Sequence, residues 1–324
     1  MIKIIIRIVI TALLFFLIFR SVELGSVLDV IREIDLVFLL PALLLQVGST
    51  LVAAYRWFLI MHLLDFGQSL FYYIGSYFKG TFFNQALPTS IGGDAMRILD
   101  AGKLGSGHKE AFYGVFIDRI VGLSGLLILN LIAIILSPDL LPRGIQWMIA
   151  LIALSGISGV VVLLLLQQLN WLTRYRITRM FHHISRRMNR VYHSIASAGV
   201  QTGLSLAIHL LAMGCIYLIG RSVGLDLPFL TYLVLVPPAL LLTIIPVSLA
   251  GWGVRESAMI GLFLLISADK TVVLSMSLLY GVLLIIVSLP GLYFYITGHT
   301  HKLQELSKEL TDELSEELSG DKQE

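Results

Sequence analysis

The 324-residue sequence is poor in charged residues and has a single cysteine. Charged residues make up 14% of the chain and hydrophobic residues 57%, whereas soluble domains carry about 25% charged residues. No water-soluble fold buries so much apolar surface, so we predict an all-α integral membrane protein. The one cysteine, Cys215, excludes an intrachain disulfide. A net charge of +2 is too small to indicate a nucleic-acid partner.

Signatures of enzymes, cofactors and metals are also scarce. Gly105-Ser106-Gly107 lacks the further glycines and the preceding strand of a dinucleotide-binding loop. His182-His183 has no acidic or cysteine ligand nearby, which argues against a metal site. No nucleophile stands beside a base, and no paired acidic residues suit a metal-bound sugar nucleotide. We therefore expect no cofactor and no metal, and favour a transporter over an enzyme.

Six stretches meet or approach the length of a membrane span, which takes about 20 apolar residues. They cover residues 4–20, 37–62, 111–137, 146–168, 200–222 and 273–297. The first is either a signal peptide or a retained helix, and we favour the helix because no small-residue cleavage site precedes residue 22. Two further apolar stretches, 70–104 and 228–267, are interrupted near the middle by proline and glycine.

The arginines predict the orientation of the chain in a prokaryotic-type cytoplasmic membrane. Segment 171–193 holds six arginines and no acidic residue, so the positive-inside rule places it in the cytoplasm. Counting spans from it, with the N-terminus also inside, puts both termini in the cytoplasm. The broken stretches then become re-entrant hairpins, 70–104 from the cytoplasmic side and 228–267 from outside. The second limb of stretch 70–104 is not expected to cross the whole membrane. It contains Asp94, Arg97, Asp100 and Lys103, and each charge costs about 2.5–3.5 kcal/mol at the bilayer centre.

Two polar segments complete the domain organisation. The basic loop 169–199 has apolar residues at helical spacing and is predicted to lie on anionic lipid headgroups; the alternative is a solvated connector. The acidic tail 299–324 carries a leucine stripe, which either binds a soluble partner or shields itself. The predicted transmembrane domain is 1–298, with halves 1–145 and 146–298.

The tips of the two broken stretches resemble each other. Residues 88–97 and 246–255 both contain Pro-x-Ser-aliphatic-small-Gly and then an arginine. Each tip follows two predicted spans and precedes a third, and the charge count orients the two sets oppositely. The fold prediction is therefore six transmembrane helices and two re-entrant hairpins in inverted repeats. Paired broken segments in matching places of two halves indicate a transporter's binding site.

The residues at each tip suit a lipid phosphate. A helix that restarts after proline presents unpaired backbone N–H groups and the positive end of its dipole. Serine is a favourable cap, and glycine lets a headgroup approach the backbone. Such irregular backbone at membrane depth must line protein or a water-filled cavity. The candidate headgroup-binding residues are Ser90, Gly92, Gly93, Asp94 and Arg97 at the first tip, Asp118 and Arg119 in the third span, and Ser248, Gly251, Gly253, Arg255 and Glu256 at the second tip.

Arg97 and Arg255 are the first candidates for phosphate contact, because a guanidinium grips phosphate in a forked geometry. In the alternative interpretation these arginines are only neutralised. Arg97 would pair with Asp94 one turn back, and Arg255 with Glu256 or a neighbouring helix. We regard Glu256 as a poor partner for Arg255 because adjacent residues on a helix point apart.

Other polar residues have two interpretations each. Asp118 and Arg119 are either functional intramembrane charges or residues that snorkel from the inner end of their span. Arg56-Trp57 is interpreted chiefly as an interfacial anchor. Asn84, before the first tip, either donates to a ligand or satisfies freed backbone carbonyls.

These motifs together resemble a known family. They are Arg56-Trp57, the segment FNQALPTSIGGDAMR at 83–97, DRIVG at 118–122 and the second tip through residue 259. With them the chain resembles the lysylphosphatidylglycerol synthase transmembrane-region, or flippase-like, family over about residues 5–298. Ser257 departs from the glycine that the family often has there. The sequence is expected to be a stand-alone member, because it ends without a soluble aminoacyltransferase domain.

The resemblance implies that the membrane region flips a lipid, since in the family it is held to move an aminoacylated phospholipid between leaflets. We expect a translocase for an anionic phospholipid or a polyprenyl-phosphate-linked lipid, with Arg97 and Arg255 on the phosphate and no ATP-binding motif. The alternatives are an integral-membrane transferase for lipid-linked sugars, or a scaffold that recruits a lipid-modifying enzyme through the tail. Expected partners are membrane lipids, with a homo-oligomer and a soluble protein as open hypotheses.

Overall fold

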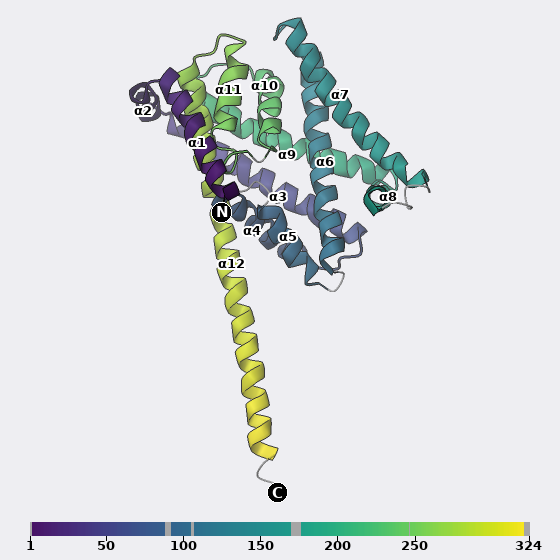
Figure 1. Cartoon of the computed structure of the whole chain (residues 1–324). Coiled ribbons are helices and arrows are strands. Elements are labelled where there is room, and N and C mark those ends of the chain that lie inside the picture. Colours follow the sequence, from purple (N-terminus) through teal and green to yellow (C-terminus); the bar gives the residue numbers. More distant parts are fainter. Residues whose placement is uncertain (1, 88–91, 105–106, 170–175, 246, 321–324) are drawn as a thin grey trace.

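The computed structural model describes residues 2–87, 92–104, 107–169, 176–245 and 247–320. These residues form helices joined by short connections, and no β-strand occurs among them (Figure 1). The helices are α1 (Ile2–Ser21), α2 (Leu24–Arg32), α3 (Leu39–Leu63), α4 (Leu70–Ala86), α5 (Gly92–Gly102), α6 (Gly107–Leu136), α7 (Arg143–Leu165), α8 (Arg176–Val191), α9 (Ile195–Ser222), α10 (Phe229–Leu242), α11 (Val254–Leu264) and α12 (Lys270–Gly320).

Five of the described helices are long and apolar enough to cross a membrane. They occupy Leu36–Leu63, Gly107–Leu136, Arg143–Gln168, Ile195–Ser222 and Lys270–Gly298. A sixth span results if α1 and α2, which bend by 84° at their junction, are counted together. The prediction of an all-α polytopic membrane protein is confirmed, with five or six spans.

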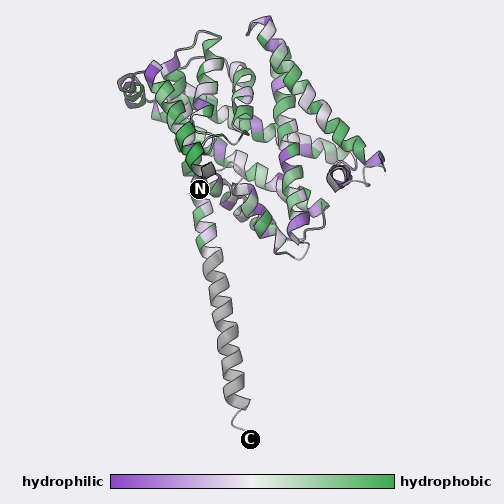
Figure 2. Cartoon of the chain, viewed as in Figure 1, coloured by the Kyte–Doolittle hydropathy of each residue, from purple (hydrophilic) through white to green (hydrophobic). Residues whose placement is uncertain are grey.

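Apolar side chains cover the outside of the bundle. Figure 2 shows hydrophobic residues along most helices around the bundle, and many large ones are exposed, such as Ile135 at 69%, Leu136 at 64% and Trp147 at 67%. Contiguous apolar surface of this extent is unstable in water but suits lipid. The fold therefore needs a bilayer around it.

The two broken stretches form the helix pairs α4/α5 and α10/α11. In Figure 1 the α10/α11 pair lies toward one end of the bundle and the α4/α5 pair toward the other. The α4/α5 connection falls on residues 88–91, which lie outside the described residues together with the predicted cap Ser90. The membrane depth of each pair and the inverted repeat stay predictions.

Helix α10 keeps its course through two consecutive prolines because α6 compensates for them. Pro237 and Pro238 lie inside the helix and have no N–H, so the carbonyls one turn back lose their partners. Asn130 of α6 supplies both missing hydrogens, since its Nδ2 donates to the oxygens of Leu233 and Val234 at 3.0 and 2.9 Å. The buried Asn130 side chain thus links α10 to α6 by two hydrogen bonds.

Helix α12 runs without a break from the last span into the acidic tail and projects from the bundle (Figure 1). Within the bundle it packs closely on α4 at Gly291. A Cβ atom at this position would lie 2.0 Å from the backbone oxygen of Phe78, so only glycine permits the contact.

Helix α8 lies within the predicted basic loop, and part of its apolar face is buried in protein. Ile184, Met188 and Val191 are fully buried against the cluster that contains Trp57. These three side chains contact protein, and the prediction that the loop lies on anionic lipid headgroups stays a prediction. Another unexpected element is α2, which is too short to be recognised as a span and lies beside α12.

Candidate functional site

The centre of the candidate site is the carboxylate of Asp118, which is 1% exposed in α6. Its Oδ1 accepts hydrogen bonds from Nε and Nη2 of Arg56 at 3.1 and 2.9 Å. Its Oδ2 accepts from Nη2 of Arg97 at 2.6 Å. One carboxylate thus links α3 and α5 to α6. Both oxygens bind arginine, which compensates for the cost of burying the charge.

The spacing of the segment Asp118–Gly122 explains how the arginine of α3 reaches this carboxylate. A Cβ atom at Gly122 would lie 3.0 Å from Nη2 of Arg56, so the glycine leaves room for the guanidinium one turn beyond Asp118. Nη1 of Arg56 also donates to Ser205 of α9 at 2.9 Å. Arg56 is only 4% exposed. Its predicted role as an interfacial anchor is therefore wrong, because its charge is used inside the bundle.

Arg97 packs against the faces of two aromatic rings. Its guanidinium carbon lies 4.1 Å from the ring centroid of Trp57 and 4.7 Å from that of Tyr77, which favours a cation at both faces. Its Nη1 also reaches Asp94 at 3.5 Å, as the pairing alternative expected. The Nε atom is buried and has no hydrogen-bond partner among the described residues.

The start of α5 is fixed against α4 by two glycines and an asparagine. The N–H of Gly93 donates to Oδ1 of Asn84 at 2.9 Å. A Cβ atom at Gly93 would lie 2.1 Å from the oxygen of Gly80, and one at Gly92 would lie 2.8 Å from Leu87. The Gly93 amide is therefore not free for a phosphate. Asn84 satisfies a backbone N–H, and not the carbonyl that one interpretation proposed.

A cavity of about 580 Å³ opens beside these charges. It is bordered by α3, α4, α5, α6, α9 and the end of α10, and thus by both arms of the first predicted hairpin and one arm of the second. Its polar lining is Arg56, Tyr77, Thr81, Asn84, Asp94, Arg97, Asp118, Arg119, His209 and Thr243, and its apolar lining is Phe116, Ile120, Leu123, Leu126, Leu240 and Ile244, with Gly80 and Gly122 between them. The cavity therefore has a charged wall and an apolar wall, which match the headgroup and the acyl chains of a lipid.

Arg119 is the accessible cation of this cavity. Its side chain is 42% exposed, against 5% and 6% for those of Arg56 and Arg97, and it pairs with Asp94. The three arginines and two aspartates that line the cavity leave one net positive charge. Asp118 and Arg119 therefore have different partners, one in the buried network and the other at the rim.

The second tip forms a separate buried pair. Nη2 and Nε of Arg255 donate to Oε1 of Glu256 at 2.6 and 3.0 Å, so the expectation that adjacent positions keep them apart is wrong. The reason is that Glu256 folds back over the start of α11, where its Oε2 accepts from the N–H of Gly253 at 2.6 Å. Ser277 of α12 donates to Oε1 of the same carboxylate at 3.2 Å.

The other residues of the second tip shape the backbone. Gly251 and Gly253 have φ angles of 81° and 83°, which glycine adopts without strain. Ser248 does not cap α11, which begins six positions later, so this prediction is wrong; its hydroxyl is buried without a partner among the described residues. Trp252 packs on Arg255, with 4.9 Å from guanidinium to ring centroid.

The structure thus brings four of the predicted site residues together on one cavity, namely Asp94, Arg97, Asp118 and Arg119, while Arg255 and Glu256 lie outside its lining. Sequence reasoning missed the roles of Arg56 and His209 there. The signal for both was a polar side chain within a long apolar helix. In the described residues no group of histidine, cysteine and acidic side chains is arranged to hold a metal.

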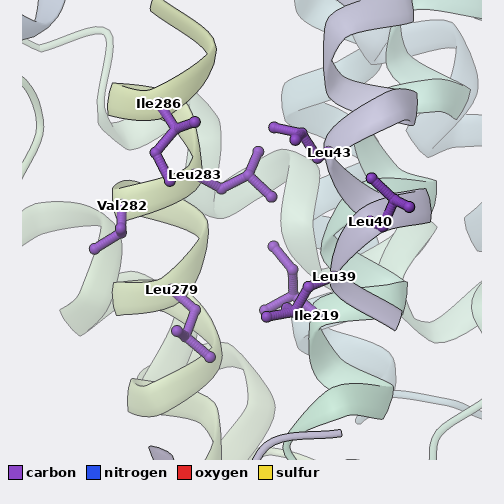
Figure 3. A pocket seen from close by; sticks show the side chains of 8 residues that line it. All are labelled: Leu39, Leu40, Leu43, Ile219, Leu279, Val282, Leu283 and Ile286. Carbon is purple, nitrogen blue, oxygen red and sulfur yellow. The ribbon is translucent and has the colours of Figure 1, made fainter. Parts of the chain in front are cut away.

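Two other hollows differ in chemistry. A groove of about 230 Å³ between α12 and the α3/α9 side is lined only by leucine, isoleucine and valine (Figure 3). It suits an acyl chain and has no group for a headgroup. A cleft of about 570 Å³ under α8 contains Arg187, which forms a forked pair with Glu110 at 2.6 and 2.8 Å.

Comparison with protein families gives one match of nearly full length. The family model described as "Lysylphosphatidylglycerol synthase TM region" matches residues 4–291, a range that includes the cavity and both tips. A comparison with curated proteins finds no match.

Proposed function

Because the chain belongs to the lysylphosphatidylglycerol synthase transmembrane-region family, we propose that it is a lipid translocase of the cytoplasmic membrane. The observation that carries the proposal is the exposed guanidinium of Arg119 at the edge of a cavity that also has an apolar wall. A phosphate beside a guanidinium and acyl chains beside leucine and phenylalanine are the two contacts that a phospholipid needs.

In this proposal the headgroup enters the cavity and its phosphate meets Arg119 first. The phosphate competes with Asp94 for that guanidinium and approaches Arg97, whose unpartnered Nε lies deeper. Asp118 keeps Arg56 and Arg97 in place and is not displaced, since both of its oxygens are bound. The acyl chains lie along Phe116, Ile120 and Leu123. One net positive charge matches a headgroup that carries a single negative charge.

The second tip has the corresponding role in the inverted half. Arg255 and Glu256 neutralise each other while the cavity borders the first tip. Rocking of the halves would open the second tip instead, and would free Arg255 for the phosphate on the other side of the membrane. Alternating exposure of two arginine-bearing tips moves the headgroup without a covalent step.

The proposal is tested with purified protein in liposomes that contain headgroup-labelled lipids. Leaflet exchange is followed with an impermeant quencher for a phosphatidylglycerol, a polyprenyl phosphate and the zwitterionic phosphatidylcholine. We expect exchange above protein-free vesicles for an anionic lipid and little for the zwitterion. Folded protein that exchanges none of them would contradict the translocase.

A recruiting scaffold is the second candidate, and the length of α12 favours it. This helix continues through residue 320 and projects from the bundle as one rod (Figure 1), which would present the acidic tail to a soluble enzyme. Deleting 299–324 separates the two functions. A translocase keeps its exchange rate without the tail, whereas a scaffold loses its partner in a pull-down.

A further inference from the structure

A histidine of α9 lies in the wall of the same cavity. His209 is the one histidine among the residues that line it, and its Nε2 lies 2.9 Å from the backbone oxygen of Gly122 in α6. This contact fixes the ring against the segment that also accommodates Arg56. Ionisable side chains inside a membrane domain are candidates for function.

The contact with Gly122 determines which nitrogen exchanges a proton. A carbonyl oxygen only accepts, so Nε2 of His209 must carry a hydrogen in either charge state. Nδ1 is therefore the atom that gains or loses the proton. The ring keeps its bond to α6 while its charge changes, so protonation needs no rotation of the side chain.

Ionisable groups from four other helices face the cavity around His209, and the arginines and aspartates among them are paired with one another. They are Arg56 from α3, Tyr77 from α4, Asp94 and Arg97 from α5, and Asp118 and Arg119 from α6, while α10 contributes only Leu240, Thr243 and Ile244. Asp118 binds Arg56 and Arg97, and Asp94 binds Arg97 and Arg119. Neither carboxylate bonds to His209 in the described structure. An imidazolium in the empty cavity would face Arg56 without a counter-charge, whereas a bound phosphate supplies one.

We infer that His209 takes up a proton when an anionic headgroup enters the cavity and releases it when the headgroup leaves. Nδ1 gains the proton from water on one side of the membrane and returns it to water on the other, and no bond of the lipid changes. Lipid movement would then be coupled to a proton gradient. The inference rests on the proposed translocase and adds its coupling ion.

Binding is measured first, because it does not depend on transport. Purified protein in a neutral detergent is titrated calorimetrically with dihexanoylphosphatidylglycerol, near neutral pH, in buffers of different ionisation enthalpy. The wild type is expected to take up as much as one proton per lipid, and its affinity to rise up to about tenfold per unit fall in pH. His209→Gln keeps a donor for Gly122 but has no titrating nitrogen, so it should bind lipid without proton uptake.

The matched control is His193→Gln. His193 is exposed, its Nδ1 makes a similar contact with the oxygen of Arg190 at 3.0 Å, and it is not among the residues that line the cavity. This variant should take up the same number of protons as the wild type. The inference is overturned if the wild type takes up none on binding, or if His209→Gln takes up as many.

Leaflet exchange under an imposed pH gradient then separates this inference from the proposed function. We expect the direction of the gradient to change the net flux of a labelled phosphatidylglycerol in the wild type, and His209→Gln to exchange lipid without responding to it. Wild-type exchange that ignores the gradient overturns proton coupling and leaves the translocase in place. Absence of both lipid binding and exchange contradicts the proposed function, and the inference with it.

Discussion

Asp118 and Arg97 are joined by a 2.6 Å ion pair between α6 and α5, although they lie 21 positions apart in the sequence. The same carboxylate binds Arg56 of α3. One buried carboxylate therefore holds three helices together, and it lies in the wall of the cavity.

Neutralising this carboxylate should destabilise the protein strongly. Asp118→Asn leaves Arg56 and Arg97 buried without their counter-charge, and breaking a buried pair in this way costs about 3–5 kcal/mol. Thermal unfolding in detergent should show a Tm far below that of the wild type. Asp139→Asn, on an exposed connection, is the control and should leave Tm unchanged. Equal Tm values for both variants would mean that the network contributes nothing to the fold.

The Asn130 side chain should contribute to the free energy of unfolding chiefly when Pro237 and Pro238 are present in α10. Asn130→Ala leaves the oxygens of Leu233 and Val234 without donors, and each buried unsatisfied group costs about 1–3 kcal/mol. In the background Pro237→Ala with Pro238→Ala the helix regains both N–H groups, so the same change should cost much less. A double-mutant cycle by thermal unfolding measures the difference, and an additive cycle would refute the compensation.

Two glycines of α12 should respond oppositely to alanine. Gly291→Ala places a Cβ where the backbone oxygen of Phe78 lies, so α4 and α12 must separate, at a cost of about 1–3 kcal/mol. Gly298→Ala meets nothing within 4 Å and should stabilise the helix by about 0.5–1 kcal/mol. Their Tm values, measured side by side, should fall on either side of the wild type. A neutral Gly291→Ala would show that the helices are not in close contact there.

Glu256, which caps α11 and pairs with Arg255, should contribute to the stability of the protein. Glu256→Gln keeps the shape of the side chain but removes the charge that faces Arg255 and weakens the bond to Gly253. Tm should fall clearly. Arg255→Met combined with Glu256→Gln should recover part of the loss, because no unpaired charge remains buried. A double variant that is less stable than the single one would contradict this pairing.

The sequence was sufficient to predict the helical membrane class, five of the six proposed spans and the two glycine-rich breaks, because length, hydropathy and proline position are local properties. Four of the residues that it selected, Asp94, Arg97, Asp118 and Arg119, line one cavity, and their role in binding a headgroup stays a prediction. It failed for Arg56 because its partner Asp118 lies 62 positions away, and the position near a helix end favoured an interfacial anchor. It failed for Arg255 because Glu256 bends back to cap its helix, which no spacing rule shows. Helix α2 was missed because nine residues are too few for a span signal.

The most direct test of the lipid site concerns Arg119, the most exposed of the three arginines that line the cavity. Leaflet exchange of labelled phosphatidylglycerol is compared for the wild type, Arg119→Ala, Arg119→Lys and the exposed control Arg143→Ala in the same liposomes. We predict exchange about tenfold slower in Arg119→Ala, an intermediate rate in Arg119→Lys because the charge remains without the fork, and the wild-type rate in Arg143→Ala. Equal rates in the wild type and Arg119→Ala, with both proteins folded, would contradict the account.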